Sequence, residues 1–93
     1  MIKSFRDRRT QELFDLGASH GVPADLASRA VKRLGRIEIA RSVGDLRFPR
    51  GLRLHKLHGD RAGEYSIAVN RQWRICFRFD DGDAYDVEFC DYH

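Results

Sequence analysis

The sequence predicts a small α+β domain in which two helices cover one face of a largely antiparallel sheet. Its 93 residues are the size of one domain. Apolar residues between positions 26 and 37 recur with the period of an amphipathic helix, whereas apolar and polar residues alternate in four segments after position 51. Because the helical segments precede every alternating segment, this order favours α+β over a parallel α/β arrangement.

Two helices are expected in the first half of the chain. Residues 1–5 form a short segment with apolar residues at both ends, and we expect this segment to form an edge strand. The segment 6–16 has an irregular stripe of apolar residues and is followed by Gly17, which predicts a first helix. Pro23 is placed to begin a second helix, which has apolar residues at i, i+3, i+4 and i+7 and ends near Arg41.

Four strands are expected in the second half, each with alternating polarity and each bounded by turn residues. They cover residues 52–57, 64–69, 72–79 and 84–93. The stretch between the helices and these strands contains Gly and Pro and is typical of a connector. We therefore expect a single domain over residues 1–93, with both helices on one face of a four- to five-stranded sheet.

The alternation also predicts how the strands pair. The apolar faces of the last two strands coincide only if paired residue numbers sum to an even value such as 164, which requires a three-residue turn from Asp81 to Asp83. This register places Arg78 opposite Asp86. With Val69 opposite Trp73 in the preceding hairpin, Glu64 also lies beside Arg78. We therefore expect Arg78 to form ion pairs with both carboxylates, with contact to RNA as the alternative. Arg74 then lies on a polar face among small residues.

The charge is divided unevenly along the chain. The net charge is +3, but residues 1–79 carry +9 and residues 80–93 carry −6. Fourteen of the 17 cations are Arg, whose planar guanidinium matches two phosphate oxygens at once. We therefore expect a polyanionic partner. The cations on the second helix either contact phosphate or form a solvated face, and the sequence leaves both readings open; they are Arg29, Lys32, Arg33 and Arg36.

Several classes of protein are not expected. No apolar stretch is long enough to span a membrane or to form a signal peptide, so we expect a cytoplasmic protein. Cys76 and Cys90 lack the spacing of metal ligands, and we interpret both as reduced structural residues. Neither a metal nor a cofactor is expected.

One group of residues combines acid, base and cationic functions. His55, His58 and His93 lie in strand or strand-end segments near the polar face, with Arg74 and Tyr92. Such a set suits cleavage of RNA by its own 2′-hydroxyl, since a base removes that proton, a cation stabilises the phosphorane and an acid protonates the leaving 5′-oxygen. These five residues are the candidate catalytic set of a metal-independent endoribonuclease. The candidate RNA-binding residues, which would also contact any larger RNA assembly that carries the substrate, are Arg6, Arg8, Arg9, Arg50, Arg53 and Lys56.

Several stretches of the chain match one family pattern. They are MIKSF at the start, HGVPADL before the long helix, LHKLHGDRAGEYSIAVNRQWRICF in the strands, and GDAY and DYH near the end. These stretches span essentially the whole chain, and the combination of GDRAG, the WRI segment and terminal DYH is specific. On these residues the chain resembles a HigB-type toxin of the RelE/ParE superfamily of bacterial toxin–antitoxin proteins.

The resemblance implies a compact RelE-like fold and a toxin that cuts translated messenger RNA in the ribosomal A site, an mRNA interferase that inhibits translation and growth. The functional positions of such toxins match His55, Arg74, Tyr92 and His93. The implied partners are the 70S ribosome with its messenger RNA and a HigA-like helix-turn-helix antitoxin. Promoter DNA would be bound only through the antitoxin complex, and no membrane partner is implied.

One position departs from the family pattern, and two other functions stay open. HigB-like enzymes have a Lys directly before the GDR segment, where this chain has His58, and Lys56 is expected on the opposite strand face. Cleavage is therefore expected to be weaker or more dependent on pH.

ParE-like members of the superfamily instead inhibit DNA gyrase without RNA chemistry, although a gyrase binder has no reason to assemble these His, Arg and Tyr residues. The third reading is an attenuated RNA-binding module.

Overall fold

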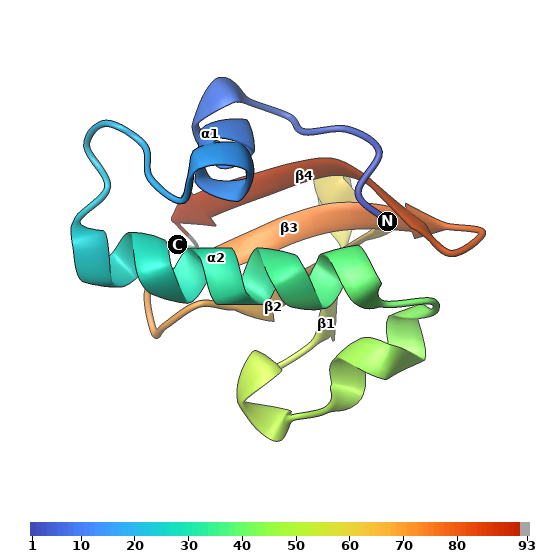
Figure 1. Ribbon diagram of the computed structural model, residues 1–93. Helices are drawn as coiled ribbons and strands as arrows, with labels where there is room; N and C mark the ends of the chain where they lie inside the picture. Colours follow the sequence, from blue (N-terminus) through green and yellow to red (C-terminus); the bar gives the residue numbers. More distant parts are fainter. Residues whose placement is uncertain (92–93) are drawn as a thin grey trace.

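The computed structural model describes residues 1–91 of the chain (Figure 1). Its helices and strands are α1 (Arg8–Leu16), α2 (Ala24–Ile39), β1 (His55–Lys56), β2 (Glu64–Ala68), β3 (Trp73–Asp80) and β4 (Asp83–Asp91). Three short 3₁₀-helices lie in the connections, namely η1 (Val43–Arg47), η2 (Arg50–Leu52) and η3 (Gly59–Arg61).

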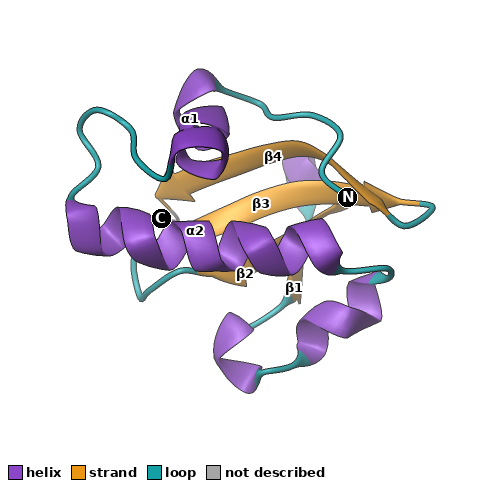
Figure 2. Ribbon diagram, in the orientation of Figure 1, coloured by secondary structure: helices purple, strands orange, loops and turns teal. Residues whose placement is uncertain are grey.

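The strands form one sheet in the order β1-β2-β3-β4, and all neighbours are antiparallel. The N-terminal segment lies parallel to β4 along its outer edge, where Ile2 pairs with Ala84 and Phe5 pairs with Val87. Both α-helices lie on one face of the sheet (Figure 2). The predicted fold class, with two helices on one face of a four- to five-stranded sheet, is confirmed.

Local chemistry sets the helix boundaries. The Asp7 carboxylate caps α1 by accepting a hydrogen bond from the backbone N–H of Thr10 at 2.8 Å, and Gly17 ends the helix with a left-handed φ of 78°. Helix α2 begins directly after Pro23, as predicted, and ends at Ile39. No helix within residues 1–91 is long and apolar enough to cross a membrane.

The core lies between the helices and one face of the sheet. Leu13 of α1, Leu34 and Ile37 of α2, and Ile75 and Phe89 of the sheet are fully buried. These positions follow the helical and strand periods seen in the sequence. The opposite face of the sheet is left for polar side chains, and it carries the candidate site.

The predicted register holds for one hairpin and for half of the other. Glu64 lies opposite Arg78 in the β2–β3 hairpin, as predicted. In the β3–β4 hairpin Arg74 lies opposite Cys90, also as predicted. Beyond Cys76 the prediction is wrong, because a β-bulge shifts the register and Arg78 lies opposite Tyr85.

The turn explains this shift. Asp81 and Gly82 form a two-residue turn in place of the expected three-residue turn, and their φ values of 48° and 83° are of the kind that a type I′ hairpin requires. A two-residue turn alone would put the apolar residues of β4 on the wrong face. An extra residue at Asp86, where φ is 52°, returns the following apolar residues of β4 to the core face, so Phe89 is still buried. Closer to the turn, Ala84 is buried where Tyr85 was expected.

Within residues 1–91, Arg78 forms neither of the two ion pairs that the sequence predicts. The bulge moves Asp86 out of register with Arg78. Glu64 does lie opposite Arg78, but its carboxylate pairs with Arg61 at 2.9 Å and with Arg6 at 3.5 Å. The connection through η3 brings Arg61 onto the polar face, and strand alternation cannot predict that contact.

Candidate active site

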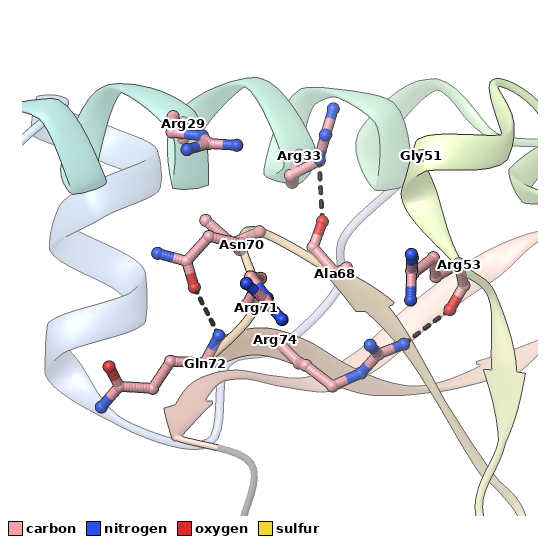
Figure 3. Close-up of a pocket in the computed structure, with 10 residues that line it drawn as sticks. Arg29, Arg33, Gly51, Arg53, Ala68, Asn70, Arg71, Gln72 and Arg74 are labelled. Carbon is pink, nitrogen blue, oxygen red and sulfur yellow. Dashed lines mark hydrogen bonds between the residues drawn. The ribbon is translucent and has the colours of Figure 1, made fainter.

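Arg74 lies on the polar face of the sheet with its side chain held in one orientation. Its Nε donates a hydrogen bond to Ser66 Oγ at 2.8 Å, and its Nη2 donates to the backbone carbonyl of Arg53 at 2.6 Å (Figure 3). The residue is only 9% exposed. Ser66 Oγ and the Arg53 carbonyl oxygen are neutral acceptors, and their hydrogen bonds orient the guanidinium group. A cation fixed in this way is suited to stabilise negative charge on a phosphate.

The first of two hollows beside Arg74 contains the predicted histidines, and we call it the histidine hollow. It is lined by His55, Lys56, Leu57, His58, Arg61, Arg74, Cys76, Cys90 and Asp91. His55 lies in β1 opposite Ser66, the residue that holds Arg74. The structure therefore brings together three of the five predicted catalytic residues.

The position of Lys56 in this hollow differs from the prediction. Lys56, which strand alternation places on the face opposite His55, lines the same hollow, because β1 is an edge strand of only two residues.

Tyr92 and His93 lie outside the residues that the structure describes. Strand β4 ends at Asp91, which lines the hollow and immediately precedes them in the sequence.

The second hollow shares Arg74 with the first, and we call it the arginine hollow. Five of its lining residues are arginines, and none of the lining residues within the described chain is Asp or Glu; the arginines are Arg29, Arg33, Arg53, Arg71 and Arg74. Figure 3 shows Arg29 and Arg33 on α2 facing the β2–β3 turn, which carries Arg71. Burial and the neighbouring charges of Arg29 and Arg36 lower the pKa of Arg33. This crowding of like charge favours the binding of an anion.

Acidic residues surround other arginines on the same polar face, in what we call the ion-pair cluster of Arg6, Arg61, Glu64 and Glu88. Arg61 Nη2 lies 2.8 Å from a Glu88 oxygen and 2.9 Å from a Glu64 oxygen. Burial disfavours the charged form of Arg61, but the hydrogen bonds to Glu88 and Glu64 outweigh burial and raise its pKa. Arg61 thus stays charged, and the two carboxylates compensate that charge.

The predicted RNA-binding residues have different surroundings. Arg53 lines the arginine hollow and Lys56 lines the histidine hollow. Arg50 is exposed in η2, next to Gly51 of the arginine hollow. Arg6 belongs to the ion-pair cluster, where it lies 3.5 Å from Glu64 and 3.9 Å from Glu88.

The two arginines of α1 lie away from both hollows. The guanidinium of Arg9 lies 5.3 Å from the ring centroid of Trp73 and 5.2 Å from that of Phe89, and its Nη2 donates to the Phe89 carbonyl at 2.7 Å. Arg9 therefore packs against the sheet. Arg8 is exposed and lines a separate depression beside Glu12 and Asp15.

Three charged residues of the hollows were not among the sequence candidates, namely Arg61, Arg71 and Asp91. Asp91 adds a carboxylate to the histidine hollow, and its Oδ2 accepts a hydrogen bond from Gln72 Nε2 at 2.9 Å. The predicted register does pair position 91 with Trp73, so it could have placed Asp91 at the site. Arg71 lies in the turn directly before β3, and its proximity to α2 is set only by tertiary packing.

The fold is that of RelE-like toxins. The chain is similar to the solved structure "YoeB-YefM complex from Staphylococcus aureus", with a TM-score of 0.63 and 17% sequence identity over 100% of this chain and 98% of that chain. A second structure with the same two proteins from that organism gives a TM-score of 0.57 and 16% identity, with the same coverage.

The sequence comparisons define the family. Residues 3–93 match the model of the HigB-like toxins, described as "RelE-like toxin of type II toxin-antitoxin system HigB". The chain is 44% identical to "Endoribonuclease HigB" of Proteus vulgaris, over 100% of both chains. It is 31% identical to "Toxin HigB-1" of Vibrio cholerae serotype O1, over 90% of both chains. This chain belongs to the HigB-like toxins of type II toxin–antitoxin systems.

Proposed function

We propose that this chain is a ribosome-dependent endoribonuclease toxin that cuts translated messenger RNA in the A site. The observation that carries the proposal is the orientation of Arg74, which is held rigidly where the histidine hollow meets the arginine hollow. A phosphate bound at Arg74 has groups for proton transfer on one side and cations for neighbouring phosphates on the other. The identity of 44% to a protein named Endoribonuclease HigB supports the same activity.

The proposed reaction is attack by the RNA's own 2′-oxygen on the adjacent phosphorus. A base removes the 2′-hydroxyl proton, the new O–P bond forms, the bond to the 5′-oxygen breaks, and an acid protonates that leaving oxygen, which leaves a cyclic phosphate. Arg74 stabilises the negatively charged phosphorane. His55 and His58 supply imidazoles for proton transfer or positive charge, and Tyr92 and His93 complete the set. Each proton-transfer group typically contributes about 10²- to 10⁴-fold to the rate.

The positive charge at the site does not depend on His58 alone. Lys56 lines the same hollow, so its ammonium group adds a second potential cation there. We therefore propose that Lys56 supplies part of the fixed charge that the family obtains from a Lys at the position of His58. His58 then makes cleavage dependent on pH without being its sole source of positive charge.

The proposed partners follow from the family. The antitoxin would be a small HigA-like helix-turn-helix protein, and only its complex with the toxin would bind promoter DNA. The two similar solved structures are complexes of a toxin with its antitoxin, which supports a protein partner of this kind. The proposed substrate implies that the active toxin would work on ribosomes in the cytoplasm.

Mapping of messenger RNA ends on ribosomes tests the proposal. The wild type, Arg74→Ala and Arg47→Ala are each induced in bacteria; Arg47 is an exposed arginine of η1 that lines neither hollow. We expect codon-phased cuts with the wild type and with Arg47→Ala, and none with Arg74→Ala. Growth arrest with intact messages and relaxed or broken DNA would instead identify a gyrase inhibitor. RNA binding without cuts would identify an attenuated module.

A further inference from the structure

Two thiols that the proposed reaction does not use lie at the histidine hollow. Cys76 of β3 and Cys90 of β4 both line it, and both are free cysteines. Their Sγ atoms are 3.1 Å apart. Cys76 is 1% exposed, whereas Cys90 is only partly buried and so is the more accessible of the two to small molecules.

The strand register holds the two sulfur atoms close together. Cys76 lies opposite Glu88 and Cys90 lies opposite Arg74, so the two cysteines are diagonal neighbours on the same face of adjacent strands. An S–S bond is about 2.05 Å long, so the sulfur atoms need to approach by only about 1 Å to form one. The ladder pairs Arg74 with Cys90 and Cys76 with Glu88, and these pairings keep the sulfurs adjacent.

The same geometry does not favour a metal site. Two thiolates on a tetrahedral zinc ion, with Zn–S bonds of about 2.3 Å, lie about 3.8 Å apart, which is farther than these sulfurs. Within residues 1–91 no group of three or more His, Cys, Asp or Glu side chains is arranged to hold a metal ion. The pair is therefore better placed to bond to itself than to chelate.

The surroundings favour one thiolate shared by the pair. The hydrogen bond from Cys90 lowers the pKa of Cys76, burial opposes this change, and the positive charge of Arg61 adds to it. The pKa of Cys90 is raised, mainly by its hydrogen bond to Cys76 and by burial. Thiol oxidation begins with a thiolate, and a second thiol in contact is then ready to resolve the product.

We propose that Cys76 and Cys90 form a reversible disulfide when the protein meets hydrogen peroxide. A thiolate of the pair attacks one peroxide oxygen, so an S–O bond forms, the O–O bond breaks and hydroxide leaves. The second sulfur then attacks the sulfenic sulfur, the S–S bond forms, the S–O bond breaks and water leaves. The pair loses two electrons to the peroxide, and a dithiol reductant restores both thiols.

The disulfide would slow RNA cleavage, an effect that rests on the proposed function. Cys76 is two residues from Arg74 in β3, and Cys90 directly precedes Asp91, Tyr92 and His93. Drawing the sulfurs together by about 1 Å displaces the end of β4 relative to Arg74. A displacement of this size in an active site can reduce the rate about 100-fold.

The chemical test does not depend on any activity. The reduced protein is treated with hydrogen peroxide, alkylated with N-ethylmaleimide, and analysed by intact mass and on a non-reducing gel. We expect a monomer that has lost two hydrogen atoms and takes up no label, and that regains two labelled thiols after dithiothreitol. A disulfide-linked dimer, oxygen atoms added without a bridge, or full labelling of both thiols would overturn the proposal.

Single-cysteine variants provide the control. Cys90→Ser changes the partly exposed member and so disturbs the fold less than a change at Cys76; circular dichroism checks that it is folded. With peroxide, this variant is expected to gain oxygen at Cys76 or to remain unmodified, and it cannot lose two hydrogen atoms. Loss of two hydrogen atoms by this variant would assign the change to other residues.

The effect on cleavage is measured on the same samples. We expect the oxidised wild type to cut ribosome-bound RNA about 100-fold more slowly than the reduced protein, and dithiothreitol to restore the rate. Equal rates for the oxidised and reduced protein would disprove the effect on the site. If the reduced protein cuts no RNA, the proposed function fails, and the mass measurement still decides whether the disulfide forms.

Discussion

The arginine hollow and the ion-pair cluster belong to one small protein, yet their arginines have opposite surroundings. In the ion-pair cluster, Glu64 and Glu88 lie 2.8 to 3.9 Å from the guanidinium groups of Arg6 and Arg61. In the arginine hollow, Arg33 Nε donates a hydrogen bond to the carbonyl oxygen of Ala68 at 2.9 Å. Neutral oxygens orient a cation, whereas carboxylates also compensate its charge.

This difference means that the number of arginines is a poor measure of RNA-binding capacity. A phosphate that approaches Arg61 competes with two carboxylates already in place, and it also meets their negative charge. A phosphate that approaches the arginine hollow meets several cations and no acidic lining residue among those described. Under the proposed function, the strongly basic composition of the chain would therefore act mainly through the hollow that adjoins Arg74.

The largest expected effect is at Arg74, the cation shared by both hollows. Arg74→Ala should reduce the single-turnover rate of RNA cleavage on ribosomes about 100- to 1,000-fold, the loss that follows removal of one group stabilising a transition-state anion. Arg74→Lys keeps the charge but not the fork of hydrogen bonds to Ser66 and Arg53, so we expect only partial recovery. A tenfold or smaller loss in Arg74→Ala would remove it from the centre of the site.

A second effect concerns the histidine hollow. His58→Lys replaces an imidazole that loses charge as pH rises with an ammonium that stays charged. We expect cleavage to become faster and less dependent on pH, as measured by the rate against pH. An unchanged rate and pH optimum would show that Lys56 alone supplies the fixed charge.

A third effect compares one arginine from each region directly. Arg71→Ala should lower the slope of log affinity for single-stranded RNA against log salt by about 0.7, because one phosphate contact is lost. Arg6→Ala, which removes a compensated cation, should change that slope by less than half as much. Equal slopes for the two variants, measured by filter binding or fluorescence anisotropy, would contradict the difference drawn between the two regions.

The smallest effect should come from weakening the ion-pair cluster. Glu88→Gln removes the carboxylate closest to Arg61, so we expect the free energy of unfolding in urea to fall by about 1 kcal/mol or less. The same change leaves Arg61 less compensated and should increase the salt slope for RNA. A loss of stability with no change in slope would show that Arg61 is out of reach of RNA.

Much of the fold was predictable because it depends on local periods. The spacing from Leu26 to Ile37 predicted the long helix, and alternation predicted the β2–β3 register, including Ala68 opposite Arg74. The β3–β4 register failed near the turn because positive φ at Asp81 and Asp86 permits a tight turn followed by a bulge. Alternation alone contains no signal for an inserted residue.

Strand period and hairpin pairing are enough to predict that Arg74 lies on a polar strand face among small residues. The motifs along the whole chain are likewise enough to indicate the family. Which arginines are compensated depends instead on packing, because Arg6 meets Glu64 and Glu88 across 58 and 82 positions of sequence, and α2 meets the turn at Arg71 only through tertiary contact. Charge compensation acts through space, so it depends on how distant elements pack together.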